Sequence, residues 1–198
     1  MQASRNFRPA RITDAASLAV LVDIAGEGMP ASMWSTMTAP GQSLFELGRE
    51  RARRDTGGFS YRNAVVAEIG GEVVACLVGY RLDDPYDLSG LDEMPELVRA
   101  LVLLEAKAPG SWYINVLAAF PEVQRQGLGR QLLDIAERKG REMGAPAVSV
   151  IVGTWNEGAR RLYARAGFAP LANKPAILPP GFTHKGDWAL MVKPLEAP

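Results

Sequence analysis

Residues 111–152 carry the pattern that most limits the fold of this chain. An apolar stretch at 112–119 is followed by Gly127 and Gly129, and apolar residues then recur at helical spacing over 128–143. Residues 147–152 (AVSVIV) are apolar almost throughout, which is typical of a strand that is buried on both faces. This order predicts a strand–helix–strand unit inside an α/β fold.

The flanking residues predict further strands and helices around this unit. Strands are expected over 5–9, 63–69, 73–82, 168–171 and 187–192, with Gly70-Gly71 as a hairpin turn. Helices are expected after Thr13 or Asp14, which would be the N-cap, and over 43–54, 96–107 and 156–166, whereas 29–42 is expected to be a loop. We predict one α/β domain over residues 1–198, with a mixed central sheet of about six or seven strands and helices on both faces.

Composition favours a soluble globular protein. Lys plus Arg and Asp plus Glu both number 22, so the formal net charge is zero and nucleic acid is not expected as the main partner. No signal peptide is recognised and no apolar stretch approaches the ~18 residues of a membrane span, so we expect a cytoplasmic protein without a membrane partner. Cys76 is expected to be a buried structural thiol. The single His184 has no second His or Cys to join it, so no metal is expected.

The turn Gln124–Gly129 (QRQGLG) is suited to binding an anion. The first N–H groups of a helix lack intrahelical partners and carry partial positive charge. Gly127 and Gly129 have no Cβ, so a ligand can approach the backbone closely. The pattern is neither the G-x-G-x-x-G fingerprint nor a P-loop. On these residues alone, a tight turn without a ligand is an equal alternative.

Two segments together resemble the GNAT superfamily of N-acetyltransferases. Residues 117–129 match its Q/R-x-x-G-x-G/A turn after a strand, and residues 156–168 match its N-x-x-A-x-x-L-Y-x-x-x-G-F motif. Both occur in the family's order and spacing, with the strand at 147–152 between them. The resemblance is specific over about residues 111–169, and before that only the order of elements agrees.

The resemblance implies that acetyl-CoA is the co-substrate and that a primary amine, of a small molecule or of a peptide or protein, is the acceptor. The pyrophosphate would bind at Gln124, Arg125, Gln126, Gly127, Leu128, Gly129 and Arg130. The pantetheine arm would bind the backbone of Leu117, Ala118 and Ala119, and Asn156 would hold it from the other side. Tyr163 would donate a proton to the departing thiolate. Considered alone, Tyr163 is better explained as a core tyrosine on an amphipathic helix, and only the complete motif favours the catalytic role.

Two positions depart from the family pattern. Arg125 stands where many members have glycine, and its side chain adds bulk beside the phosphate. Many members also carry a general-base glutamate six residues before the last strand position of the motif. Counting back from Ala119 gives Tyr113, so the base is unassigned. A water chain, Glu27 and Glu105 are the candidates.

The acceptor is expected to contact residues 26–42 and 83–110, and Trp34, Tyr113 and Asn115 are the candidate acceptor-binding residues. Acidic residues in 83–110 would favour a cationic amine, although a solvated loop explains them equally well. Trp34 and the neighbouring methionines could instead form a core flap or a homodimer contact. The alternative function is a non-catalytic CoA-binding sensor or interaction module, and the alternative donor is a longer acyl-CoA.

Overall fold

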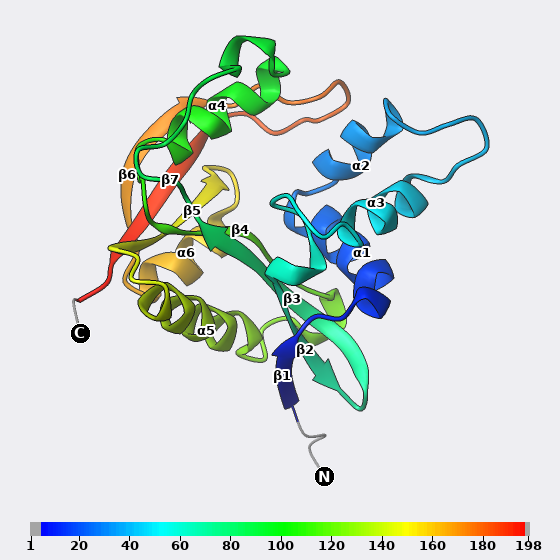
Figure 1. Cartoon of the computed structure of the whole chain (residues 1–198), viewed down its shortest axis with the longest axis horizontal. Coiled ribbons are helices and arrows are strands. Elements are labelled where there is room, and N and C mark those ends of the chain that lie inside the picture. The colour runs from blue at the N-terminus through cyan, green and yellow to red at the C-terminus, as the bar shows by residue number, and fades with distance from the viewer. Residues whose placement is uncertain (1–4, 197–198) are drawn as a thin grey trace. The chain divides into compact units, whose positions relative to one another are not determined.

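The computed structural model describes residues 5–196, which contain a mixed seven-stranded sheet (Figure 1). Its strands are β1 (Arg5–Pro9), β2 (Ala64–Ile69), β3 (Glu72–Arg81), β4 (Trp112–Ala119), β5 (Ala147–Gly153), β6 (Ala169–Pro175) and β7 (Asp187–Pro194). They follow one another in the order β1-β2-β3-β4-β5-β7-β6. The pair β4–β5 is parallel, and the pairs β1–β2, β2–β3, β5–β7 and β6–β7 are antiparallel. The predicted α/β class with a mixed sheet is confirmed.

The α-helices of residues 5–196 are α1 (Ala15–Ala25), α2 (Met29–Ser35), α3 (Leu44–Ala52), α4 (Glu96–Glu105), α5 (Leu128–Glu142) and α6 (Glu157–Arg165). The predicted loop over 29–42 is wrong in its first half, where α2 forms. Pro30 lies in the first turn of α2, where its missing N–H leaves no intrahelical bond unmade. Trp34 then gives this short helix a buried anchor. None of the helices in the described part of the chain is both long and apolar enough to cross a membrane.

The chain divides into two compact units, each made of two separate stretches. Unit 1 contains 115–132 together with the described residues up to Gly79. Unit 2 contains 80–114 together with the described residues from Leu133 onward. The expected single domain over residues 1–198 therefore stays a prediction, and the two units are described in turn.

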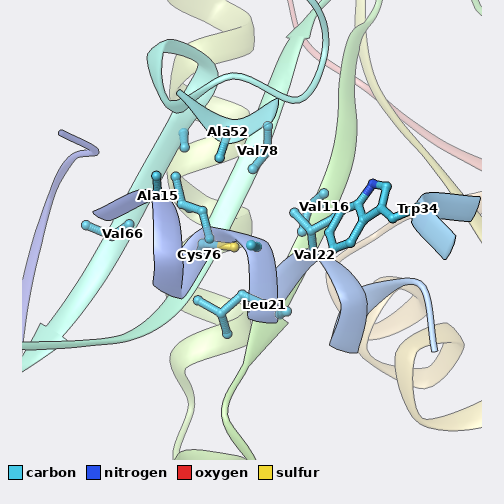
Figure 2. Packing of buried hydrophobic residues seen from close by; sticks show 13 residues of the cluster. Ala15, Leu21, Val22, Trp34, Ala52, Val66, Cys76, Val78 and Val116 are labelled. Atoms are coloured by element: carbon cyan, nitrogen blue, oxygen red, sulfur yellow. The ribbon is translucent and has the colours of Figure 1, made fainter. Parts of the chain in front are cut away.

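The core of unit 1 gathers around α1 and the hairpin strands β2 and β3. Figure 2 shows Leu21 and Val22 of α1 close to Cys76, and the same cluster takes in Trp34 and Val116. Full burial of a Leu or Val side chain stabilises a fold by about 1.5–3 kcal/mol, so this cluster is a main source of the unit's stability. Cys76 is fully buried, and burial raises the pKa of its thiol to about 12, so the predicted structural thiol is confirmed.

The hairpin turn between β2 and β3 is formed by Gly70 and Gly71, as predicted. Their φ angles are +62° and +87°, a backbone region that glycine enters without a steric penalty. Ala67 pairs with Ala75 on the partner strand, and the register shifts between Ala67 and Glu68.

Asp14 precedes α1, but its side chain does not cap the helix as the sequence suggested. Its carboxylate accepts hydrogen bonds of 2.7 Å from the backbone N–H of Arg11 and from Arg8 Nη1. The Arg8 guanidinium also donates to Glu68 Oε1 at 2.5 Å. Both carboxylate oxygens are thus occupied by Arg8 and Arg11, which leaves the start of α1 without a side-chain cap.

Unit 2 is held together by the strands that follow β4 and by two polar contacts. Trp112–Ile114 pair with Val148–Val150 of β5, and β7 pairs along the whole of β5. The hydroxyl oxygens of Ser111 and Ser149 lie 2.7 Å apart in the interior. Lys193 Nζ donates to Glu137 Oε1 at 2.5 Å, which neutralises a buried carboxylate.

Candidate functional site

The turn between β4 and α5 has a backbone shaped for an anion. Gln124 follows a short 3₁₀ turn and its Nε2 donates to the carbonyl oxygen of Ala119 at 3.0 Å. Arg125 has φ +60° and Gly127 has φ +86°, and α5 begins at Leu128. Backbone that enters the left-handed region just before a helix turns successive N–H groups toward one concave side, which is the geometry that binds phosphate.

The surface of this turn is open to a ligand. The side chains of Gln124, Arg125 and Gln126 are exposed, whereas Leu128 is buried and anchors the first turn of α5. A Cβ added at Gly127 would meet no atom within 4 Å, so the space beside its backbone is empty in this structure. The turn therefore leaves open space beside Gly127, next to the start of α5.

Arg5 also belongs to this turn, and sequence reasoning missed it. Its Nη1 donates to the carbonyl oxygen of Gln126 at 2.8 Å, and its Nη2 lies 3.4 Å from Gln126 Oε1. The two residues are 121 positions apart, and the motif contains no residue of β1, so only the folded chain reveals the contact. A guanidinium beside the turn adds positive charge where an anion would bind.

The end of β4 shows one buried and one accessible face. Val116 and Ala118 are buried in the core of unit 1, whereas Asn115 is exposed and Leu117 and Ala119 are half-buried. This alternation follows the two-residue period of a strand. Asn115, Leu117 and Ala119 therefore lie on the accessible face.

In unit 2, Asn156 and Tyr163 lie on α6. Asn156 is the N-cap, and its Oδ1 accepts from the backbone N–H of Ala159 at 3.0 Å, which fixes the start of the helix. Tyr163 is 5% exposed and its ring packs at 5.8 Å from that of Phe168. Burial raises the pKa of the Tyr163 phenol above its usual value of 10, so this side chain keeps its proton at neutral pH.

Tyr113 of β4 is also buried in unit 2, and it belongs to a polar cluster. Its ring meets that of Tyr80 edge-on at 5.8 Å, and its hydroxyl group lowers the pKa of the neighbouring Glu105 carboxyl, against the larger raising effect of burial. Burial raises the pKa of Tyr113 most, and the charges of Glu105 and of other tyrosines, including Tyr163, raise it further. The structure thus brings two predicted site residues, Tyr113 and Tyr163, into one electrostatic cluster.

Trp34, the third candidate acceptor residue, lies in the core of unit 1. It is 4% exposed, stacks on Phe59 at 6.3 Å and meets Phe45 edge-on at 6.3 Å. This packing agrees with the alternative, given above, that Trp34 belongs to the hydrophobic core. A contact of Trp34 with an acceptor stays a prediction.

His184 stacks on Trp155 at 5.5 Å with the two rings nearly parallel. Across residues 5–196, no group of three or more His, Cys, Asp or Glu side chains has an arrangement that could hold a metal ion.

The mixed α/β sheet, the glycine-containing turn after β4 and the tyrosine-bearing α6 together define an acetyltransferase fold. The family model described as the acetyltransferase (GNAT) family matches residues 32–168, which is more than half of the chain. The chain belongs to the GNAT acetyltransferase family, as the two motifs predicted. No curated protein matches the sequence at a significant level.

Solved structures of acetyltransferases share this fold over nearly the whole chain. An agmatine N-acetyltransferase is 17% identical with a TM-score of 0.67, covering 96% of this chain and 99% of that one. YncA from Salmonella typhimurium, solved with its cofactor acetyl-CoA, is 17% identical with a TM-score of 0.62, covering 97% and 94%. The ribosomal-protein-S18-alanine N-acetyltransferase from Escherichia coli is 16% identical with a TM-score of 0.60, covering 98% and 96%.

Proposed function

We propose that the protein is an N-acetyltransferase that moves the acetyl group of acetyl-CoA to a primary amine by direct attack in a ternary complex. The turn at Gln124–Gly129 carries this proposal. Its two residues of positive φ and its open space beside Gly127 suit the diphosphate of coenzyme A. Membership of the GNAT family supports acetyl transfer as the reaction.

The backbone from Arg125 to Arg130 binds the diphosphate in this proposal, and Gln124 fixes the turn through Ala119. The backbone of Leu117, Ala118 and Ala119 binds the pantetheine arm. Pairing with β5 uses Trp112–Ile114, which precede these three residues. Asn156 holds the arm from the start of α6, where its capping bond to Ala159 already orients its side chain.

Tyr163 is proposed to protonate the leaving thiolate. Attack of the amine nitrogen on the thioester carbonyl forms a C–N bond, and the C–S bond then breaks with its electron pair on sulfur. A buried phenol whose pKa is raised is neutral at pH 7 and can give its proton to that sulfur. The proton that nitrogen loses after attack restores the phenol.

The test is release of free thiol by the purified protein with acetyl-CoA and a panel of amines. The panel includes agmatine, the amine in the name of one structural relative. It also includes a peptide with N-terminal alanine, which represents the ribosomal-protein alanine in the name of another. We expect acceptor-dependent thiol release and an acetylated amine by mass spectrometry. The absence of both acetyl-CoA binding and turnover would contradict the proposal.

A CoA-binding sensor is the second candidate function, and one observation favours it. Tyr113 stands at the strand position where many family members carry a catalytic glutamate. Tight acetyl-CoA binding without turnover of any amine in the panel would support the sensor. Mass spectrometry of the ligand retained on purification separates acetyl-CoA from a longer acyl-CoA.

A further inference from the structure

Glu105 ends α4 with its carboxylate among tyrosine side chains. Tyr86 donates a hydrogen bond of 2.6 Å to Glu105 Oε2, and Tyr113 is close enough for its charge state to depend on that of Glu105. Tyr80 meets Tyr113 edge-on, which brings a third ring into the cluster. Glu105 itself is half-buried, and one of its carboxylate oxygens is held by the phenol of Tyr86.

The fold brings these residues together by joining the end of β3 to the start of β4. The backbone N–H of Leu82 donates to the carbonyl of Ser111 at 2.9 Å, and that of Gly110 donates to the carbonyl of Asp83 at 3.1 Å. These two bonds hold the loop after β3 beside the segment that follows α4. Tyr86, on that loop, therefore reaches Glu105 at the end of the helix.

The position of Glu105 opposes local stability in two ways. A negative charge at the C-terminus of a helix is repelled by the helix dipole. Burial also raises the pKa of its carboxyl, and the bonds from Tyr86 and Tyr113 offset this only in part. Residues that break such local rules are concentrated at functional sites.

We propose that Glu105 is the general base that takes the proton of the acceptor's ammonium group, and that the half-buried rings of Tyr80 and Tyr86 receive this cation. The inference rests on the proposed function and deepens it. Carboxylates and aromatic faces both attract an ammonium ion, and here a half-buried carboxylate is bonded to one of these tyrosines. Tyr113 of β4 stands at the position where many family members carry the base. In this proposal Glu105, at the end of α4, acts as the base instead.

The proton balance of this step is complete. The ammonium nitrogen gives one proton to the Glu105 carboxylate, and the neutral amine attacks the thioester carbonyl. The nitrogen's second proton replaces the one that Tyr163 gives to sulfur. The protonated Glu105 then returns its proton to water, so one amide, one thiol and one proton leave the enzyme.

The base and the acid of this scheme belong to one set of interacting groups. The pKa of Tyr113 responds to the charges of both Glu105 and Tyr163. The titratable groups that interact with Glu105, directly or through a neighbour, are Tyr80, Asp83, Tyr86, Tyr113 and Tyr163. A raised pKa makes the Glu105 carboxylate a stronger base than an exposed glutamate.

The test compares Glu105→Gln with Glu96→Gln, which removes the same charge from the exposed first turn of the same helix. With the best amine of the panel, Glu105→Gln should lower kcat/KM at pH 7 by about 10²-fold or more. The loss should shrink as the pH rises toward the pKa of the amine, because less of the acceptor then needs a base. The Kd of acetyl-CoA should stay unchanged in both variants, and Glu96→Gln should keep the parent rate.

Tyr86→Phe supplies an independent measurement if Glu105→Gln does not fold. This variant removes a hydrogen bond that lowers the pKa of Glu105, so the acid limb of the kcat/KM profile should move to higher pH. An acid limb that does not move overturns the inference, as does a folded Glu105→Gln that keeps the parent rate or whose defect is independent of pH. Absence of turnover in the parent overturns the proposed function as well, whereas parent turnover with an active Glu105→Gln overturns this inference alone.

Discussion

The guanidinium of Arg5 donates a hydrogen bond of 2.8 Å to the backbone carbonyl of Gln126, so the first strand of the described chain supports the turn proposed to bind the diphosphate. A turn that binds a charged ligand through its backbone must keep those N–H groups oriented before the ligand arrives. Arg5 lies outside residues 32–168, which match the family model. The contact therefore links the matched turn to a strand that lies outside the matched residues.

Arg5→Ala should weaken acetyl-CoA binding. The variant removes the bond to Gln126 and a positive charge beside the proposed diphosphate site, and because the contact is exposed we expect a rise in Kd of about three- to tenfold. Titration calorimetry at two salt concentrations measures the effect. Arg11→Ala, at an exposed position before α1, is the control, and equal losses in the two variants would contradict the prediction.

Arg125→Gly should stabilise the protein. Arg125 has φ +60°, where a side chain costs about 1 kcal/mol that glycine avoids. Arg125→Ala keeps that cost and removes the same charge, so it is the matched control. In urea unfolding we expect the glycine variant to exceed the alanine variant by about 0.5–1 kcal/mol, and equal stabilities would argue against strain at this residue.

Tyr163→Phe should reduce catalysis without reducing acetyl-CoA affinity. Loss of a general acid costs about 10²-fold or more in kcat. Because burial raises the pKa of this phenol above its usual value of 10, the parent rate should not fall through loss of the Tyr163 proton below about pH 10. Tyr61→Phe, which removes a hydroxyl bonded to Asp55, is the control. An unchanged kcat in Tyr163→Phe would exclude this tyrosine as the acid.

Asp14→Asn should lower stability at neutral pH but not in strong acid. The hydrogen bond from Arg8 lowers the pKa of Asp14 below its usual 3.8, so its stabilisation is fully present above about pH 4 and is lost as the pH falls through the lowered value. We expect a loss of about 1–3 kcal/mol in the unfolding free energy at pH 7. The difference from the parent should shrink as the pH falls through the lowered pKa of Asp14.

Asp55→Asn is the control for that measurement. Asp55 also pairs with an arginine, Arg62 at 2.7 Å, but both side chains are largely exposed. Solvent screens such a pair, so its removal should change the unfolding free energy by less than about 1 kcal/mol. A loss as large as that of Asp14→Asn would show that burial is not what gives the Arg8–Asp14 pair its strength.

Gly48→Ala should destabilise unit 1, whereas Gly158→Ala should not. A Cβ at Gly48 would lie 2.5 Å from Cζ3 of the buried Trp34 ring, an overlap that costs about 1–3 kcal/mol. At Gly158, also helical, the nearest atom would be 3.8 Å away, and the better helix propensity of alanine should raise stability by about 0.5–1 kcal/mol. Thermal unfolding of both variants measures the two opposite shifts.

Local patterns predicted most of the fold. The hairpin at Gly70-Gly71 and the apolar strand at 147–152 formed as expected, because turn chemistry and strand hydrophobicity act over a few residues. The helix α2 was missed because its seven residues offer too little periodicity. It depends on burial of Trp34 against α3, a contact that appears only when the chain has folded.

For the candidate site too, the sequence predicted the short continuous motifs but not the contacts between distant residues. Its motif residues could be found from spacing, because Gln124–Gly129 and Asn156–Phe168 are short continuous segments. Asp14 shows the limit of this reasoning. Its sequence position is that of an N-cap, but Arg8 from the preceding strand draws its carboxylate away.

The sequence by itself determined the order of elements, the GNAT family and the turn that suits a diphosphate, because periodicity and motif spacing express local geometry. Only the tertiary structure decided which distant residues contact the candidate site residues. Arg5 meets Gln126 across 121 positions, and Tyr86 meets Glu105 across 19. Such contacts arise from packing of whole elements, and the same packing sets the desolvation that shifts the pKa of Glu105 and Tyr163.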